Sequence, residues 1–423
     1  MRVAEFAQQV QHHVVREDGS GLAKLFSMHA PSTRRCFATI ANPSASTVHS
    51  LLPPLPPPWP DLCTQYLRSG ALLFGPSGPT RTPSESWTLA CDALQGVLTA
   101  FLRYTTQLSA GRWVLPLLLS LLGDLRWVSQ HADDALNAAT HAATPDARPS
   151  HKYTEDCARQ LNKAFSACVA DRNPSLDESK KWATYALVGM LFRLYFQLHS
   201  TALCKNVLRA LSAADLPPMD QFPRADQTTF HYYCGRLAFM DEQYGRADAE
   251  LSQAFSDAPK SAVHNCERIL LYLIPTRLLL GIRPARALLS VYPRLEALYK
   301  ALIEACCEGA VARYDALIAD LPTERTLVRL GVYLAFERAR ELCVARLFSR
   351  AYAVSGKETR MRLAAFQHAL AWQGVHTNVR EAEWALATLV AKGRIKGYIA
   401  HERQVVVLSA KDPFPAPTLA MLT

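Results

Sequence analysis

The segment 381–415 constrains the fold most, because it places a helix, a tight turn and two short strands in immediate succession. Its helix has an apolar face at helical spacing, formed by Trp384, Leu386, Leu389 and Val390. Gly393 stands at the position of a C-terminal cap. Two segments rich in Ile, Val and Tyr follow at 394–400 and 404–408, joined by the turn 401–403. This order is typical of a winged helix, which binds nucleic acid or docks another protein; a plain β-hairpin capping a helical domain is the alternative.

A long helical region precedes this segment. From Trp87 onwards, apolar residues recur at helical spacing for about 270 residues. The chain has 423 residues, 49% of them hydrophobic, and can bury more than one core. We predict three domains: an N-terminal helical region with a proline-rich insert (1–150), TPR-like helical repeats (151–320) and a winged-helix end (321–423). The insert, 51–60, cannot lie inside a helix and is interpreted as a stiff surface spacer, with a ligand for an aromatic groove as the alternative.

The segment 231–259 has the spacing of a tetratricopeptide-type helical hairpin. Small or apolar residues recur where two such helices cross, and a proline marks the exit: Gly235, Ala247, Leu251, Ala254 and Pro259. Hairpins of this kind form peptide-binding surfaces or only hold domains together, and the second role is favoured here. The predicted fold class is therefore mainly α, a TPR-like right-handed helical solenoid that ends in a C-terminal winged helix.

Several function classes find no support in the sequence. No apolar run reaches the roughly 18 residues that span a bilayer, so no membrane partner is expected. The eleven cysteines are scattered without a Cys-x-x-Cys pair, and we interpret them as reduced core residues. Phosphate-binding, zinc-protease and nucleophile-elbow motifs do not occur in the sequence. We therefore expect no enzyme activity, no cofactor and no metal.

The charge of the chain is uneven. Its net charge is +9, and the segment 325–411 holds 15 Lys or Arg against 6 Asp or Glu. Such a one-sided surplus suits a polyanion, either nucleic acid or an acidic protein.

The expected nucleic-acid contacts lie in and around the winged helix. They are Arg380, Lys392, Arg394, Lys396, Tyr398, His401, Arg403 and Lys411. Alternation along 394–400 predicts that Arg394, Lys396 and Tyr398 share one face of a strand. Two cations beside an aromatic ring suit phosphate contact and base stacking. We expect binding governed by charge and shape, with little base specificity.

Several motifs resemble those of a known family. They are Asp177-Glu178-Ser179-Lys180-Lys181-Trp182, Leu203-Cys204-Lys205, Leu208-Arg209-Ala210, Tyr232-Tyr233, Gly235-Arg236, Ala249-Glu250-Leu251-Ser252, Arg268-Ile269-Leu270-Leu271-Tyr272-Leu273-Ile274-Pro275, Leu279-Leu280-Gly281, Gly393-Arg394-Ile395-Lys396-Gly397-Tyr398-Ile399-Ala400-His401 and Lys411-Asp412-Pro413-Phe414-Pro415. In combination they resemble the PCI-domain-containing protein 2 family, the PCI subunits of the nuclear transcription-coupled mRNA-export complex.

This resemblance implies a non-enzymatic scaffold and a PCI fold. It implies a winged helix paired with that of a large Sac/GANP-like export scaffold, the two together forming a platform for RNA or DNA. It also implies a small acidic Dss/Sem-type partner, and a nuclear location that includes the nuclear pore, with some cytoplasmic pool. A purely structural subunit of a lid- or signalosome-like assembly, without nucleic-acid contact, is the alternative.

Protein partners are assigned to two further groups of residues. The acidic partner is expected at arginines ahead of the winged helix: Arg325, Arg329, Arg338, Arg340 and Arg346. Arg338 and Arg346 are about two helical turns apart and can line one face. The pairing partner is expected at Val405 and Val407, whose strand would expose an apolar edge if nothing covered it.

Overall fold

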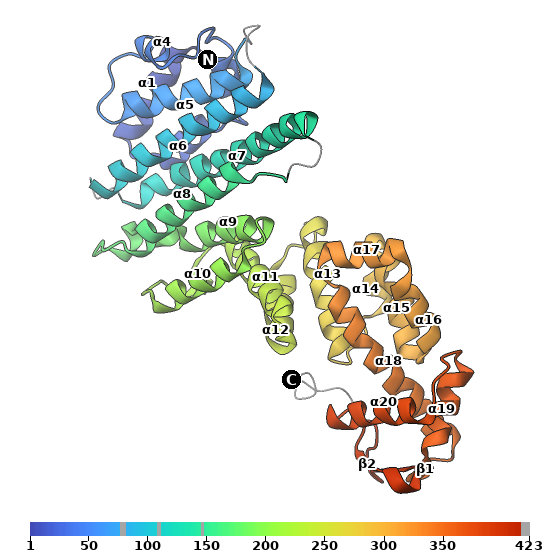
Figure 1. Ribbon diagram of the computed structural model, residues 1–423. Helices are drawn as coiled ribbons and strands as arrows, with labels where there is room; N and C mark the ends of the chain where they lie inside the picture. The colour runs from blue at the N-terminus through green and yellow to red at the C-terminus, as the bar shows by residue number, and fades with distance from the viewer. Residues whose placement is uncertain (77–81, 108–110, 145–147, 416–423) are drawn as a thin grey trace. The chain divides into compact units, whose positions relative to one another are not determined.

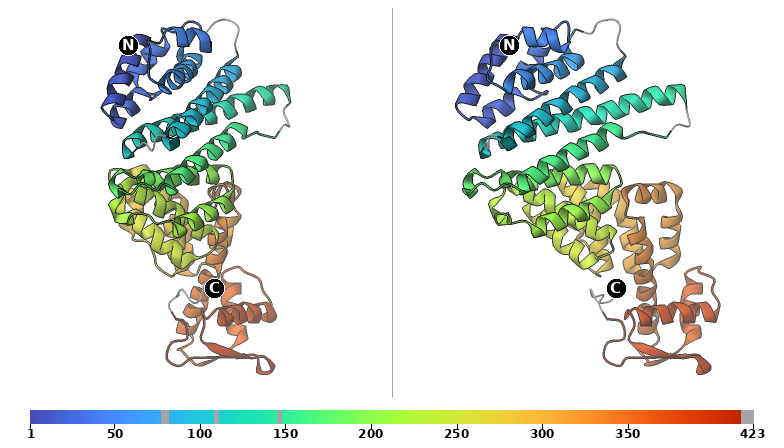
Figure 2. Two further views of the ribbon diagram at one scale, coloured as in Figure 1. Left: turned by 90° about the vertical axis from the view of Figure 1, so that its left-hand side faces the viewer. Right: turned by 60° about the vertical axis from the view of Figure 1, so that its left-hand side comes forward.

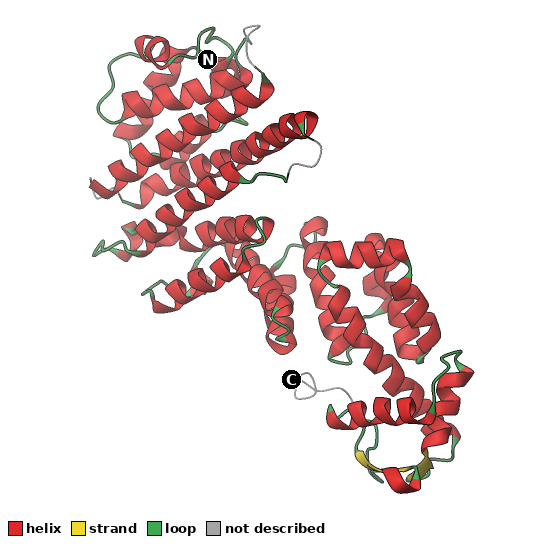
Figure 3. Cartoon of the chain, viewed as in Figure 1, coloured by secondary structure: helices red, strands yellow, loops and turns green. Residues whose placement is uncertain are grey.

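The computed structural model describes residues 1–76, 82–107, 111–144 and 148–415. The chain divides into two compact units, Met1–Asp226 and Gln227–Thr423. Helices dominate both units, and the strands lie near the C-terminus (Figures 1 and 3). The predicted domain boundaries near residues 150 and 320 stay predictions.

The first unit is built from helices that pack in chain order. They are α1 (Val3–Val15), α2 (Gly19–Leu25), α3 (Pro31–Phe37), α4 (Ala45–Ser50), α5 (Trp59–Phe74), α6 (Pro83–Gln107), α7 (Leu115–Ala143), α8 (Lys152–Val169), α9 (Thr184–Gln197) and α10 (Thr201–Ala213). From α5 to α9 each helix contacts the next one, and the long helices α5 to α8 lie side by side (Figure 2). The proline-rich segment ends where α5 begins, with Pro60 in its first turn as a rigid helix start.

Helix α7 is central to this core because its apolar residues recur every three or four positions. Leu118, Leu121 and Leu125 are each at most 2% exposed. Asp133 on the same helix accepts hydrogen bonds from the backbone N–H groups of Tyr153 and Thr154, at 3.0 and 2.8 Å. Its carboxylate thereby satisfies free donors at the start of α8, which is a structural role.

The second unit continues the helical pattern. Its helices are α11 (Arg224–Met240, which begins at the boundary), α12 (Tyr244–Asp257), α13 (Val263–Leu279), α14 (Arg286–Val291), α15 (Pro293–Glu308), α16 (Val311–Ala319), α17 (Leu321–Leu330), α18 (Tyr333–Val354), α19 (Leu363–Trp372) and α20 (Val379–Ala391). A Cβ atom added to Gly235 on α11 would lie 2.6 Å from Leu251 Cγ on α12. The expected crossing of two helices at a small residue is therefore confirmed, since any larger side chain would force them apart.

A small antiparallel sheet and two helices close the chain as a winged helix. The strands are β1 (Arg360–Arg362), β2 (Gly397–Ala400) and β3 (Val405–Leu408), in the order β1-β3-β2. Met361, Val406 and Leu408 belong to the same buried core as Leu386 and Leu389 of α20. The predicted fold class, a TPR-like helical solenoid ending in a winged helix, is confirmed.

Three expectations for this region are wrong. Strand β3 pairs with β1 on one side and β2 on the other, so it has no free edge. The expected apolar edge was wrong because the sequence did not predict β1. The first predicted strand begins at Gly397, not at residue 394. Trp384 is 73% exposed and does not join Leu386 and Leu389 in the core.

The cysteines agree with the prediction of reduced core residues. All eleven are free, and Cys307 alone among them is only partly buried. Burial raises the thiol pKa of Cys91 to about 11 and of Cys157 to about 12, so both remain protonated and unreactive at neutral pH. None of the helices in the described ranges is long and apolar enough to cross a membrane.

Candidate nucleic-acid and partner interface

The outer face of the winged-helix sheet brings two predicted sites together. Residues directly opposite each other on paired strands share one side of a sheet. Val407 of β3 is opposite both Arg360 of β1 and Tyr398 of β2. Val405 is likewise opposite Arg362 and Ala400. We name these six residues the outer sheet face: Arg360, Arg362, Tyr398, Ala400, Val405 and Val407.

This face combines free cations with an exposed ring. Tyr398 is 62% exposed, and Arg360 and Arg362 are also exposed. Within the described residues, no ion pair engages either arginine. Val405 and Val407 are half-buried in the middle of the face. Tyr398, predicted to bind nucleic acid, thus lies beside Val405 and Val407, predicted to bind a partner.

Three other predicted cations are held by acids of the same unit. Lys392 at the end of α20 forms an ion pair with Glu341 of α18. Lys396 Nζ lies 3.0 Å from Asp412 Oδ2.

His401, in the turn after β2, is the third predicted nucleic-acid contact that has an acidic side chain as its partner. Its Nδ1 lies 2.6 Å from Glu383 Oε1 on α20. A phosphate would have to compete with these carboxylates, so Lys392, Lys396 and His401 are weaker anion sites than their residue types suggest.

The remaining predicted cations lie on different elements. Arg380 shares the exposed side of α20 with Trp384, one turn away. Arg403 is exposed in the turn between β2 and β3, and Lys411 is exposed in the segment after β3. Among the described residues, no ion pair engages Arg380, Arg403 or Lys411.

Arg394 does not lie where the strand pattern placed it. It is 5% exposed, so it does not share the exposed face of Lys396 and Tyr398. The N–H groups of Arg394 and Ile395 both donate to Leu389 O, at 2.8 and 3.2 Å. These bonds keep both residues in the turn that ends α20, where alternation along a strand does not apply.

Of the five predicted arginines ahead of the winged helix, three have hydrogen-bond or ion-pair partners and two are simply exposed. Arg325 and Arg329 on α17 are exposed. Arg338 pairs with Glu242. Arg340 Nε and Nη2 lie 2.6 and 2.7 Å from the two oxygens of Asp315. Arg346 Nε donates to Cys307 O at 3.3 Å, so it does not form a common free face with Arg338.

Sequence reasoning missed Arg360 and Arg362. The pattern Arg-Met-Arg, a buried residue between two exposed cations, was the available signal, but three residues are too few to establish a strand. Within the described ranges, no group of three or more His, Cys, Asp or Glu side chains is arranged to hold a metal ion.

The chain is similar to named proteins of fungi and animals. It is 42% identical over 393 residues to the Protein CSN12 homolog of Mycosarcoma maydis, covering 86% of each chain. Identity to the Protein CSN12 homolog of Schizosaccharomyces pombe is 37% over 316 residues, 73% of this chain and 74% of the relative. Identity to the PCI domain-containing protein 2 homolog of Drosophila melanogaster is 30% over 418 residues, 99% of each chain. No family model matches the chain.

Proposed function

Because the chain belongs to the family of PCI domain-containing protein 2 and the CSN12 homologues, we propose that it is a non-enzymatic scaffold subunit of a nuclear mRNA-export complex. Its winged helix binds RNA or DNA together with the winged helix of a large Sac/GANP-like scaffold. In this proposal the protein is nuclear, partly at the nuclear pore, with some cytoplasmic pool.

The outer sheet face carries the nucleic-acid part of the proposal. Arg360 and Arg362 on β1 and Arg403 in the turn are exposed, and no ion pair engages them within the described residues. Tyr398 offers a ring on which a base can stack, and the arginines can contact phosphates. Among the described helices, none exposes a row of Asn, Gln and Arg that could read bases, so binding depends on charge and shape.

The acidic Dss/Sem-type partner is proposed to bind at α17. Arg325 and Arg329 are one turn apart on this helix and exposed. Arg338 and Arg340 are less suitable for that partner, because they already pair with Glu242 and Asp315.

A second candidate function is a structural PCI subunit without nucleic-acid contact. The observation that favours it is the half-buried pair Val405 and Val407 at the centre of the outer sheet face. Apolar side chains surrounded by arginines also suit a protein interface. The two candidates predict different responses to salt and to loss of the arginines.

The test is fluorescence anisotropy of labelled single-stranded RNA across a salt series, with the full chain alone and with its partners. We expect Arg360→Gln/Arg362→Gln to weaken binding and to flatten the logarithmic salt slope by about 1.4, at roughly 0.7 for each lost phosphate contact. Tyr398→Ala is expected to cost about 1–3 kcal/mol of binding free energy through lost stacking.

The matched control is Arg246→Gln/Arg294→Gln, which removes two exposed arginines of the same unit away from the sheet. It should leave the salt slope unchanged. Equal effects of the two double variants would mean that net charge alone attracts RNA. Normal assembly without RNA binding by any variant or by the wild type would favour the structural subunit.

A further inference from the structure

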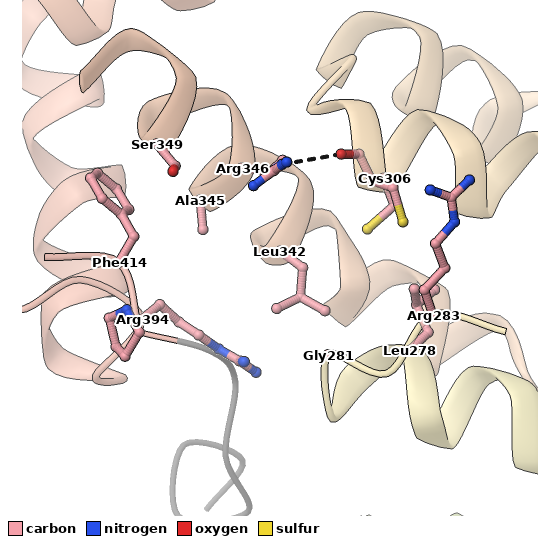
Figure 4. Close-up of a pocket in the computed structure, with 12 residues that line it drawn as sticks. Leu278, Gly281, Arg283, Cys306, Leu342, Ala345, Arg346, Ser349, Arg394 and Phe414 are labelled. Atoms are coloured by element: carbon pink, nitrogen blue, oxygen red, sulfur yellow. Dashed lines mark hydrogen bonds between the residues drawn. The ribbon is translucent and has the colours of Figure 1, made fainter. Parts of the chain in front are cut away.

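A cavity of about 380 Å³ lies within the second unit, apart from the outer sheet face. It is bounded by the ends of α13 and α15, by α18, and by the segments that follow α20 and β3 (Figure 4). Three arginines contribute to its lining, Arg283, Arg346 and Arg394, and no Asp or Glu belongs to the lining within the described part of the chain. Leu342 and Phe414 supply apolar wall. The cavity is therefore strongly cationic but not uniformly polar.

Arg394 is the unusual member of this lining. Its side chain extends from the segment after α20 into the cavity (Figure 4). It is 5% exposed, and its buried Nε and Nη1 atoms have no hydrogen-bond partner among the residues that the structure describes. The negative charge of Glu341 favours the charged form of Arg394, but that carboxylate already forms an ion pair with Lys392. Leaving a buried cation without an acceptor is destabilising, so an external acceptor would be favoured here.

The surrounding structure holds Arg394 in this position. Its backbone N–H donates to Leu389 O at 2.8 Å, and the N–H of Lys396 donates to Pro413 O at 2.9 Å. The second bond holds the segment after β3 beside the cavity, where the Phe414 ring lies 5.6 Å from the Tyr352 ring. The cavity is therefore formed in the free chain, and a ligand does not have to order its walls.

The other two arginines can act with Arg394. Arg346 on α18 is exposed and has one hydrogen bond, from Nε to Cys307 O. Arg283 is exposed in the loop after α13. Both keep further N–H groups for a ligand, since a guanidinium has five. Three cations, with no acid beside them in the described lining, match a dianion better than a single carboxylate.

We propose that this cavity binds the phosphate group of a small phosphomonoester, with Arg394, Arg346 and Arg283 as its anion contacts. The organic part of the ligand lies against Leu342 and Phe414. The cavity volume is in the range of small-molecule sites. The proposal is independent of RNA binding at the outer sheet face, because it uses none of the same residues.

The test is isothermal titration calorimetry of the full chain with phenyl phosphate at constant ionic strength. We expect saturable binding with one site per chain. Arg394→Met should weaken binding at least tenfold, and Arg346→Gln or Arg283→Gln several-fold. The control, Arg294→Gln, removes an exposed arginine of α15 that does not line the cavity and should bind like the wild type.

Two further ligands test the chemistry of the site. Inorganic phosphate should bind more weakly than phenyl phosphate, because it lacks a group to contact the apolar wall. Benzoate should bind at least tenfold more weakly, because it carries one charge. Equal affinity for benzoate and phenyl phosphate, or no binding up to millimolar ligand, would overturn the proposal. So would unchanged binding by the Arg346 and Arg283 variants, whose exposed positions do not endanger folding.

Discussion

Asp124 in the first unit and Arg394 in the second are both buried ionisable side chains, 4% and 5% exposed. Asp124 Oδ2 accepts hydrogen bonds from Met28 N–H at 3.0 Å and from Tyr66 Oη at 3.4 Å. Burial raises the pKa of Asp124 to about 7, although these hydrogen bonds act in the opposite direction.

Arg394 responds to burial differently. Burial lowers its pKa below the ordinary value of an arginine, while the negative charge of Glu341 acts to raise it. An arginine remains charged at any pH at which the protein is folded. An aspartic acid can therefore adapt to the interior by taking up a proton, but an arginine adapts only by finding an acceptor. An external acceptor is therefore favoured beside Arg394 but not beside Asp124.

The largest expected effect is the pH dependence of unfolding free energy that Asp124 causes. Its folded pKa of about 7 lies above the unfolded value of 3.8. Its contribution to stability is therefore fully present below pH 4 and is lost as the pH rises through 7. The loss is on the order of 4 kcal/mol, at 1.36 kcal/mol for each pKa unit. Urea unfolding followed by tryptophan fluorescence measures it, since five of the seven tryptophans belong to the first unit.

Asp124→Asn should remove this pH dependence, because an amide oxygen can still accept from Met28 N–H and does not titrate. The control is Asp134→Asn, an exposed acid on the same helix. If the wild type and Asp124→Asn lose stability in parallel between pH 4 and pH 7, the buried carboxyl is not the cause.

At Arg394, by contrast, we expect that removing the buried charge raises stability, by a smaller amount. Replacing this buried cation, whose Nε and Nη1 have no hydrogen-bond acceptor among the described residues, with an apolar side chain of similar length should stabilise the second unit, by about 1–4 kcal/mol. Arg394→Met should therefore slow hydrogen exchange at the Leu408 amide, which donates to Thr359 O at 2.7 Å beside the sheet. The exposed Arg346→Met should bring no such gain. Faster exchange in Arg394→Met would mean that its charge has a partner in the free chain.

Much of the fold was predictable because it rests on local patterns. Helical spacing identified the long helices, and the spacing of Gly235, Ala247 and Leu251 identified the hairpin of α11 and α12, where Gly235 lies against Leu251. Strand β1 was not predictable in the same way. It has three residues, and its pairing with β3 depends on contacts far apart in the sequence.

The candidate site was predictable in charge but not in arrangement. Counting residues located the basic surplus, yet the acids that contact Lys392 and His401 lie on α18 and α20, which a count does not reveal. Arg394 was misplaced for a local reason. Gly393 has a φ of 68°, so the chain makes a left-handed turn there and includes Arg394 in the helix cap. Alternation along a strand holds only after such a turn has ended.

The smallest expected effect on stability concerns two surface arginines, one that forms an ion pair and one that does not. Arg340 contacts both oxygens of Asp315 and so joins α18 to α16, whereas Arg362 has no ion pair in the described chain. Arg340→Gln should cost about 0.5–1 kcal/mol of unfolding free energy, because a half-exposed pair is screened by water. Arg362→Gln should change stability by less than about 0.5 kcal/mol. A double-mutant cycle with Asp315→Asn isolates the pair, and its coupling energy should fall at 1 M salt. Equal losses for Arg340→Gln and Arg362→Gln, with no coupling to Asp315, would mean that pairing does not separate the structural arginines from those available to a partner.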